Sequence, residues 1–101
     1  MFIRTNISAT NKDEAYTISK TLVRNKLVAG TIIYKGICHY WWKKEIVERE
    51  YHTVQAVTLD KYKKKIVETV KKIHSDECPI IEFHEIDGNI EYLDWIKDSL
   101  K

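Results

Sequence analysis

The chain is organised around the nonapeptide Tyr40-Trp41-Trp42-Lys43-Lys44-Glu45-Ile46-Val47-Glu48. On an extended strand, neighbouring side chains point to opposite faces, so Trp41 is expected on one face and Tyr40 with Trp42 on the other. A sheet that packs helices against one face only would leave some of these rings in water. An exposed aromatic patch of this kind usually marks an interface or a ligand site. We therefore expect this segment to bind a partner.

Two long strands are predicted on either side of this segment. The run Leu27 to Tyr34 is almost entirely apolar, which predicts a buried strand. A bulge or kink at Lys35-Gly36 would let this strand continue through Ile37–Trp42. The chain is predicted to reverse at Lys43-Lys44 and to return as a strand from Glu45 to Val57. Because charged residues are concentrated in 43–50, the outer end of this hairpin is expected to project into water.

The N-terminal part of the chain predicts a strand followed by a helix. Residues Phe2 to Ser8 are rich in β-branched side chains, which favours a strand. Asn11 is placed to cap a helix that ends near Lys26, and the Glu14 carboxylate is expected to reach back to the cap amide. The apolar stripe of this helix is predicted to consist of Ala15, Ile18, Leu22 and Val23.

The C-terminal half predicts a helix, a strand and a final helix. The first helix is expected over Leu59–Ile73, and Pro79 follows its end because proline cannot continue a helix. A strand is predicted over Ile80–Ile86. After a turn at 87–89, Asn89 is placed to cap a helix that runs through Leu100. The predicted buried positions of the two helices are Tyr62, Ile66, Val70 and Ile73, then Leu93, Ile96 and Leu100.

The predicted order is therefore βαββαβ with an extra C-terminal helix, within a single domain of residues 1–101. Right-handed connections on a four-stranded antiparallel sheet give an α+β, ferredoxin-like fold with both main helices on one face. The other face is left open in a single subunit. That open face is expected to carry about half of the aromatic hairpin.

Composition excludes several classes of protein. The net charge of +2 gives no general reason to bind nucleic acid or an anionic membrane. The chain has neither an apolar run long enough to span a bilayer nor a charged-then-apolar leader, so a cytoplasmic protein is expected. Its two cysteines, Cys38 and Cys78, lack the spacing of a structural zinc site.

Nucleic-acid binding has two weak signals in the sequence. The lysines within 61–65 fall mainly on the solvent side of the predicted helix, and Glu68 interrupts the basic run, so a solvated face is favoured. The RNA-recognition fold shares the β/α order, but its aromatic strand motif is missing from 49–57. We expect no nucleic-acid partner.

Catalytic motifs are also missing. Neither cysteine has an activating motif, and three glycines cannot supply a phosphate-binding loop. No histidine pair has the i, i+4 spacing of a helical metal site, so a metal site would have to combine separate segments or subunits. The sequence therefore favours a protein that is not an enzyme.

Three motifs resemble the CutA family, the divalent-cation tolerance proteins. Asp13-Glu14-Ala15 with the later Leu22-Val23 and Lys26–Ala29 is similar to D-E-x-A…L-V…x-L-A-A. The segment from Tyr40 to Glu48 is similar to Y-W-W-x-x-x-I-x-E. The third and most specific motif is G-N-x-x-Y-L-x-W-L, which is matched by Gly88, Asn89, Tyr92, Leu93, Trp95 and Ile96.

This chain departs from the family pattern at several places, including the missing cysteine and the altered loop that follow. The family's A-A-C-V-N corresponds to Val28-Ala29-Gly30-Thr31-Ile32, so that cysteine is missing. The family loop H-P-Y-E-V-P-E corresponds to 74–80, in which only His74, Glu77 and Pro79 match. The copper ligands that the resemblance implies fall on Ala9, Ile73 and His74, so one of three is kept.

The resemblance implies a ferredoxin-like subunit in a homotrimer that is linked to tolerance of divalent metals, copper in particular, without known catalysis. The alternative is a trimeric small-molecule or metal sensor, similar to PII signal proteins, with ligand sites at subunit clefts. The resemblance implies no required cofactor, and a divalent metal such as copper is the candidate. The candidate metal ligands are His74, Glu77, Cys78 and His84, and the candidate interface residues are Tyr40, Trp41, Trp42 and Trp95.

Overall fold

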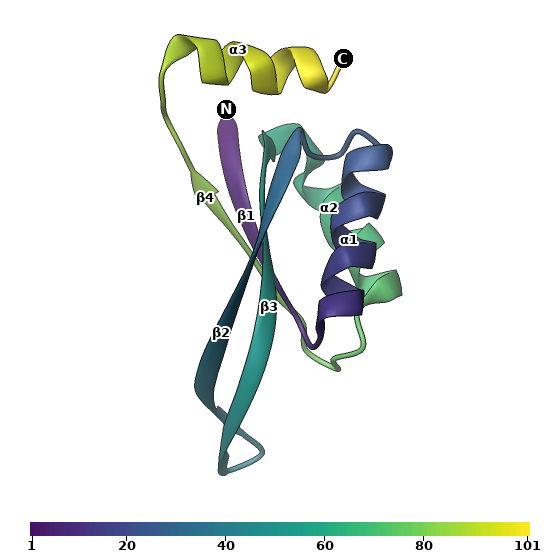
Figure 1. The fold of residues 1–101 in the computed structure, drawn as a ribbon, viewed down its shortest axis with the longest axis vertical. Coiled ribbons are helices and arrows are strands. Elements are labelled where there is room, and N and C mark those ends of the chain that lie inside the picture. Colours follow the sequence, from purple (N-terminus) through teal and green to yellow (C-terminus); the bar gives the residue numbers. More distant parts are fainter.

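The computed structural model describes residues 1–101 and shows one four-stranded antiparallel sheet with helices packed against it (Figure 1). In chain order, the elements are β1 (Phe2–Ala9), α1 (Lys12–Arg24), β2 (Gly30–Trp42), β3 (Glu45–Leu59), the 3₁₀ turn η1 (Asp60–Tyr62), α2 (Lys63–Ile73), β4 (Ile80–Glu85) and α3 (Ile90–Ser99). The strand order is β2-β3-β1-β4. The predicted βαββαβ order with a C-terminal helix is therefore confirmed. None of the helices is long and apolar enough to cross a membrane.

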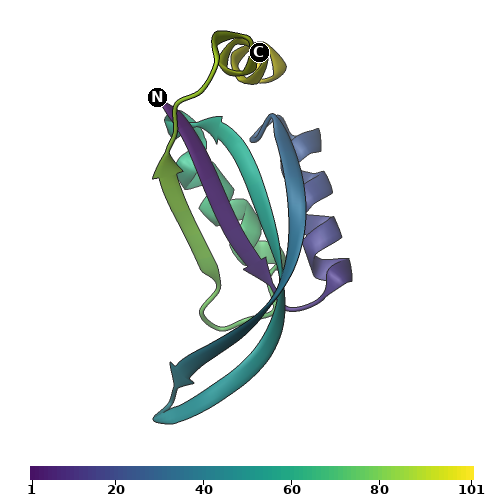
Figure 2. The ribbon, with the colours of Figure 1, turned by 60° about the vertical axis from the view of Figure 1, so that its left-hand side comes forward.

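The main core lies between the sheet and helices α1 and α2, which cover one face, while α3 crosses one end of the sheet (Figures 1 and 2). Alternate residues of β1 from Ile3 onward point toward the two helices and are buried, as the strand period requires. A smaller cluster packs under α3 and contains Val57, Ile96 and Leu100. The fully buried side chains of the main core include Ile7, Ile18, Leu22, Val54, Ile66 and Val70.

The start of α1 differs from the prediction in one bond. Asn11 caps the helix as expected, because its Oδ1 accepts the backbone N–H of Glu14 at 2.8 Å. The Glu14 carboxylate accepts a hydrogen bond from the backbone N–H of Thr10 at 3.1 Å. The sequence had predicted a bond from the backbone N–H of the cap residue, Asn11. The carboxylate therefore ties the helix to the end of β1. Along the helix, the predicted stripe ends at Leu22, because Val23 is 41% exposed.

Strand β2 begins three residues later than predicted, at Gly30. Lys26 has a left-handed φ of 54°, and the backbone N–H of Leu27 bonds back to the carbonyl of Leu22 at 3.0 Å. These bonds close the C-terminus of α1 and bury Leu27 and Val28 in the core. The apolar run that predicted a strand is therefore partly a helix terminus.

Three smaller corrections concern a helix start, a predicted bulge and a predicted cap. Leu59 ends β3, so the second helix begins after η1, at Lys63. The predicted bulge at Lys35-Gly36 is wrong, because β2 and β3 pair one-to-one from Gly30↔Val57 to Trp42↔Glu45. Asn89 occupies the cap position of α3 but makes no capping bond; its side chain donates to Glu91 instead.

The β2–β3 hairpin extends well past its neighbours. Strand β1 pairs with β3 only over 52–59, so residues 36–51 of the hairpin pair only with each other; we call this part the arm. Figures 1 and 2 show the arm bending away from the sheet and giving the molecule its long axis of 44 Å. The predicted reversal is confirmed at Lys43 and Lys44, whose φ angles are 49° and 69°. A two-residue turn with positive φ at both positions suits the twist of a hairpin.

Candidate functional site

A cavity of about 620 Å³ lies between the arm and the loop that connects α2 to β4; we call it the arm cleft. The pairing of β2 with β3 accounts for the wall that the arm contributes. Cys38 pairs with Arg49 and Tyr40 pairs with Val47, so these four side chains lie on one face of the hairpin. The arm also contributes Trp41, Trp42 and Tyr51. The loop wall is formed by Ser75, Asp76, Glu77, Cys78 and Ile80. The two walls come from segments far apart in the sequence.

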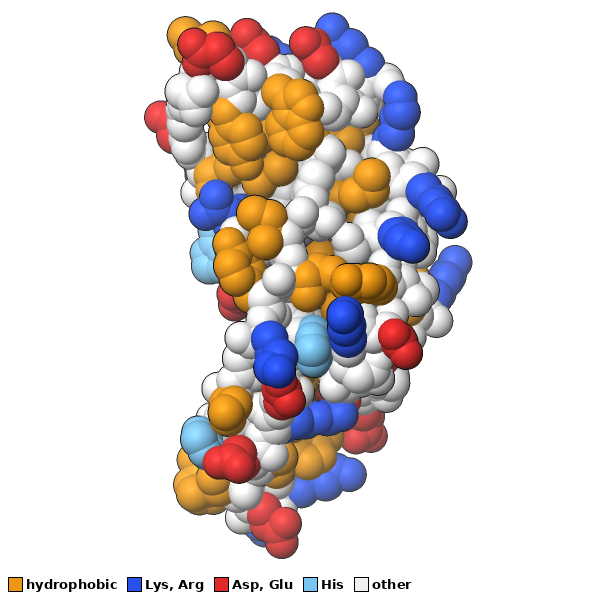
Figure 3. Space-filling view, viewed as in Figure 1, with side chains coloured by type: hydrophobic (Ala, Val, Ile, Leu, Met, Phe, Trp, Pro, Cys, Tyr) orange, Lys and Arg blue, Asp and Glu red, His pale blue; other side chains and the backbone are white.

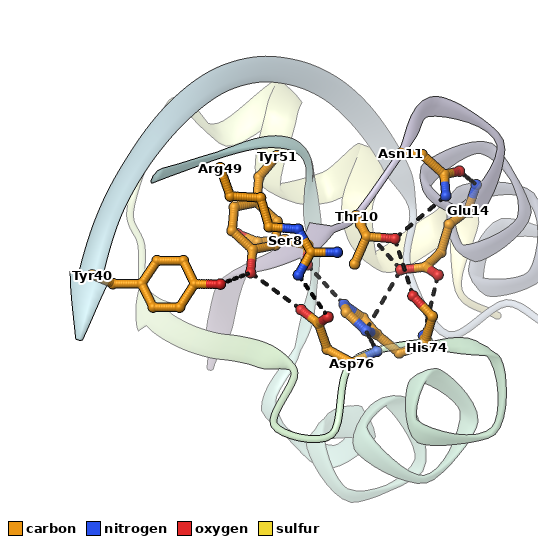
Figure 4. Close-up of polar contacts among 10 residues, drawn as sticks. Ser8, Thr10, Asn11, Glu14, Tyr40, Arg49, Tyr51, His74 and Asp76 are labelled. Carbon is orange, nitrogen blue, oxygen red and sulfur yellow. Dashed lines mark hydrogen bonds and ion pairs between the residues drawn. The ribbon is translucent and has the colours of Figure 1, made fainter. Parts of the chain in front are cut away.

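Asp76 fastens the loop to the arm (Figure 4). Its Oδ1 accepts from Arg49 Nη1 at 3.1 Å, and its Oδ2 accepts from the Tyr51 hydroxyl at 3.2 Å. The Tyr51 hydroxyl also lies 3.3 Å from that of Tyr40. The Arg49 guanidinium lies 5.3 Å from the centre of the Tyr51 ring, which adds a cation–π contact. The carboxylate thus joins the loop to β3, and the Tyr51 hydroxyl extends the contact to Tyr40 of β2.

These contacts set the charge state of the cleft. Burial raises the pKa of Tyr51, and the hydrogen bond to Tyr40 and the negative charge of Asp76 raise it further, so Tyr51 stays neutral. The hydrogen bond with Tyr40 raises the pKa of Arg49, and the Asp76 carboxylate adds to that effect although desolvation opposes it. The cleft therefore holds the neutral Tyr51 hydroxyl beside the Arg49–Asp76 ion pair.

His74 lies behind this cleft, and its side chain has no exposed surface. Its Nε2 donates to the carbonyl of Ser8 at 2.7 Å, and its Nδ1 accepts the backbone N–H of Asp76 at 3.0 Å. A carbonyl oxygen only accepts and a backbone N–H only donates, so these partners assign the neutral imidazole with its proton on Nε2. His74 therefore links the end of β1 to the loop that carries Asp76.

Glu14 completes the attachment of the loop to α1. Its two carboxylate oxygens accept the N–H groups of Thr10 and Ser75, each at 3.1 Å, and Oε1 lies 3.5 Å from His74 Nδ1. Burial raises the pKa of Glu14, but the hydrogen bonds from Ser75 and Thr10 outweigh that effect and leave the pKa below its ordinary value. Glu14 is therefore ionised at neutral pH in the folded chain.

The four candidate metal ligands are not brought together within one chain. Both nitrogens of His74 are bonded to backbone groups, Glu77 and Cys78 are exposed beside the arm cleft, and His84 lies on β4 next to Glu82. The chain has no group of three or more His, Cys, Asp or Glu side chains that could hold a metal ion. Metal binding by these residues stays a prediction.

The four candidate interface residues fall into two separate places. Tyr40, Trp41 and Trp42 line the arm cleft, and Trp41 and Trp42 are 72% and 38% exposed. Trp95 lies on α3 at the other end of the molecule, where its ring stacks on Tyr92 with centroids 6.0 Å apart. Figure 3 shows hydrophobic side chains gathered in both regions, below α3 and on the arm. Their role as an interface stays a prediction.

Three residues of the polar network, Arg49, Tyr51 and Asp76, were not predicted as site residues from the sequence. Arg49 and Tyr51 lie within the predicted return strand at a spacing of two, so their common face was readable. Asp76 had no signal of its own, because its partners lie 25 and 27 residues away in the chain. Glu14 was predicted only as a helix-capping residue, although it also holds the loop at Ser75.

Comparisons with known proteins agree with one another. The family model for the CutA1 divalent ion tolerance protein matches residues 3–99. The divalent-cation tolerance protein CutA of Thermus thermophilus is 33% identical over 95 residues, covering 92% of each chain. That of Thermotoga maritima is 28% identical over 91 residues, covering 89% of this chain and 90% of the relative.

Solved structures give the same result. A structure from Archaeoglobus fulgidus, described as the periplasmic divalent cation tolerance protein CutA, superposes with a TM-score of 0.96 at 28% identity and covers both chains completely. The divalent cation tolerance protein from Thermus thermophilus superposes with a TM-score of 0.95 at 31% identity, again over the full length of both chains.

Proposed function

Because this chain belongs to the CutA1 divalent ion tolerance family, we propose that it acts as a homotrimeric binding or scaffold protein in the response to divalent metal ions, copper in particular. The observation that supports the trimer is the exposed apolar surface of the arm, where Ile37, Trp41 and Ile46 are 66–73% exposed. Side chains of this size are rarely left together in water on a monomeric protein. A second copy of the chain that packs on the arm would remove them from water.

The shape of the sheet supports the same proposal. The arm lies beyond β1 and β4, so neither of those strands covers it. Edge strand β2 also leaves one side of its backbone unpaired along its whole length, and proteins usually cover or interrupt such an edge. The trimer supplies a covering partner without any further component.

Sedimentation velocity of the purified chain tests this proposal. We expect the mass of three chains at micromolar concentration and in high salt, because large apolar interfaces are little weakened by salt. Native mass spectrometry of the same sample gives the subunit number independently. A monomer at micromolar chain concentration would contradict the proposal.

The metal-tolerance role is proposed to involve weak copper binding, with His74, Glu77, Cys78 and His84 as the candidate ligands. Copper(II) binds most nitrogen- and sulfur-containing sites more tightly than other divalent first-row ions, so copper binding alone does not show a dedicated site. Calorimetry of wild type and His74→Gln measures the stoichiometry and affinity, which do distinguish a dedicated site. We expect weak binding that this substitution barely changes, because His74 is held by two backbone bonds. One tight copper ion per subunit that is lost in His74→Gln would show a dedicated site.

The second candidate function is a trimeric sensor similar to PII proteins, and the arm cleft is the observation that favours it. Its volume of about 620 Å³ suits a small molecule, and it combines aromatic side chains with the Arg49–Asp76 pair. Native mass spectrometry of freshly purified protein would detect a ligand that is retained. A ligand lost from Arg49→Gln but kept by Arg24→Gln would place it in this cleft.

A role without catalysis and a cytoplasmic location complete the proposal. No cysteine, histidine or carboxylate of the arm cleft forms the pair of nucleophile and base that covalent catalysis needs, since the candidate base His74 is bonded to backbone. Cys38 and Cys78 are both free thiols, which suits a reducing compartment, although the Archaeoglobus fulgidus relative is described as periplasmic. Thiol alkylation of the protein in its native cells, with both cysteines found reduced, tests the location.

A further inference from the structure

The arm cleft has an excess of negative charge on its walls. The charged residues that line it are Arg49, Asp76 and Glu77. Arg49 and Asp76 neutralise each other at 3.1 Å, and the Arg49 guanidinium also lies 5.3 Å from the centre of the Tyr51 ring. The charge that remains is the carboxylate of Glu77, whose side chain is 73% exposed. The cleft is therefore better suited to a cation than to an anion.

The cleft also offers an aromatic ring to such a cation. Tyr40, Trp42 and Tyr51 all line it. Tyr51 is buried and already has the guanidinium of Arg49 over its ring. Trp42 is the most exposed of the three, at 38%. Among aromatic side chains, the face of an indole attracts a cation most strongly, so Trp42 is the ring best placed to receive one.

Lys43 shows that an ammonium group fits between Trp42 and Glu77. Its Nζ lies 5.7 Å from the centre of the Trp42 ring and 3.8 Å from Glu77 Oε2. The side chains of Lys43 and Glu77 are 74% and 73% exposed, and ion pairs exposed to this extent contribute little. The ammonium group that the chain itself supplies is therefore held weakly, and another can replace it.

The attachments of its neighbour hold Glu77 beside the cleft. Directly before it, Asp76 accepts hydrogen bonds from Arg49 and Tyr51 of the arm. The Glu77 carboxylate has no such bond, because its contact with Lys43 is too long for one. This carboxylate is therefore positioned by the loop and remains free to accept from a ligand.

We propose that the arm cleft binds a primary alkylammonium ion that carries an apolar or aromatic body. The ammonium group takes the place of the Lys43 side chain, where it donates to Glu77 and lies against the Trp42 ring. The body enters the cleft, which has room for it at about 620 Å³ and is lined there by Val47 and Ile80. Burial of this body adds affinity that the exposed Lys43 side chain lacks. The inference rests on the second candidate function, in which this cleft holds a small molecule.

The experiment uses the full-length protein with 2-phenylethylammonium as the probe and 2-phenylethanol as its uncharged match. Nitrogen–proton correlation spectra follow the indole N–H of Trp42, with that of Trp95 on α3 as an internal control, and calorimetry gives the affinity. We expect the Trp42 signal to shift and the ammonium ion to bind about fivefold more tightly or better, because the alcohol lacks both charge contacts. Equal affinity of the two probes, or a shift at Trp95 alone, would overturn the proposal.

Variants test the two charges of the site separately. Glu77→Gln should weaken the ammonium probe by about threefold or more and leave the alcohol unchanged, whereas Glu68→Gln, exposed on α2, should bind as wild type does. Lys43→Gln removes the competing ammonium group and should strengthen probe binding by about twofold to fivefold. Lys44→Gln, in the same turn, is its matched control and should have no effect. Weaker binding by Lys43→Gln would overturn the proposal, because Lys43 would then be part of the site and not its occupant.

Sedimentation of Glu77→Gln identifies the source of the cation. A mass equal to that of wild type, together with weakened probe binding, supports a free ligand. A smaller mass would show that a lysine of a second copy occupies Glu77, and this would overturn the small-ligand proposal.

Native mass spectrometry of freshly purified protein separates this inference from the sensor function on which it rests. A retained alkylammonium compound supports both. A retained anion or neutral compound that is lost from Arg49→Gln overturns the preference for a cation, while the sensor function stands. If no ligand is retained and neither probe shifts Trp42, both fail.

Discussion

At the scale of single residues, one carboxylate on each side of the α2–β4 loop holds that loop in place. Asp76, on the loop, accepts from Arg49 and Tyr51 of the arm, whereas Glu14, on α1, accepts from the backbone N–H of Ser75. His74 lies between them and bonds only to backbone. These hydrogen bonds connect the arm to the loop and, through the loop, to α1.

The Tyr51 hydroxyl gives a direct test of this arrangement. Tyr51→Phe removes the bond to Asp76 and leaves that carboxylate with one donor fewer. We expect it to lower the free energy of unfolding by roughly 1–3 kcal/mol, because the lost bond has a charged acceptor. Tyr16→Phe, on the exposed side of α1, should change it by less than about 0.5 kcal/mol. Chemical denaturation at equal chain concentration measures both, and equal values would refute the role of the hydroxyl.

Glu14 makes stability depend on acidity. Its folded pKa lies below the ordinary value of 4.5, so its contribution is fully present above that value and is lost as the pH falls through the folded pKa. Glu14→Gln should lower stability by roughly 1 kcal/mol at neutral pH and flatten the loss of stability below pH 4.5. Thermal unfolding from neutral to acidic pH measures this. Glu68→Gln, exposed on α2, should leave the pH profile unchanged, and a Glu14→Gln profile that matches wild type would contradict the assignment.

At the scale of elements, strand and helix order followed from sequence, while the exact boundaries required tertiary contacts. The return strand of the hairpin and the cap at Asn11 were local signals and were read correctly. The C-terminus of α1 was not read correctly. Lys26 adopts a left-handed conformation there, whereas glycine is the residue that usually signals such a helix end. The pairing of the arm with Asp76 was equally unreadable, since neither segment indicates the other. Fold was thus predictable from local pattern, and the site was not.

The turn of the arm carries a cost that can be removed. Lys43 and Lys44 both adopt positive φ, a conformation that costs a residue with a Cβ about 1 kcal/mol and costs glycine very little. Lys44→Gly should therefore raise the free energy of unfolding by roughly 0.5–1 kcal/mol. A glycine in the interior of α2, Glu68→Gly, should lower the free energy of unfolding by about 1 kcal/mol. Denaturation curves of the two variants should shift in opposite directions; a shift in the same direction would contradict the turn geometry.

At the scale of the whole molecule, the proposed trimer assigns Trp41 a role that the single subunit does not. Because Trp41 is 72% exposed in one chain, Trp41→Ala should barely change the fold of the subunit. If a second copy covers it, the same change should cost roughly 1–3 kcal/mol of assembly, or about tenfold to a hundredfold in the dissociation constant. Sedimentation across a dilution series measures this. Tyr16→Ala, on the helix face, is the control, and equal effects of the two would remove Trp41 from the interface.

The unequal lengths of the strands also determine the order in which the chain can fold. The arm pairs residues close in sequence, down to Trp42↔Glu45, so it can close early and by itself. Strand β1 has no such neighbour: its partners are His52–Leu59 and then Ile80–Glu85. During synthesis, β1 must therefore wait until residues 52–59 have emerged before it can pair, with Ile3 and Ile7 exposed until then. A strand that is made before both of its partners is among the last to be protected.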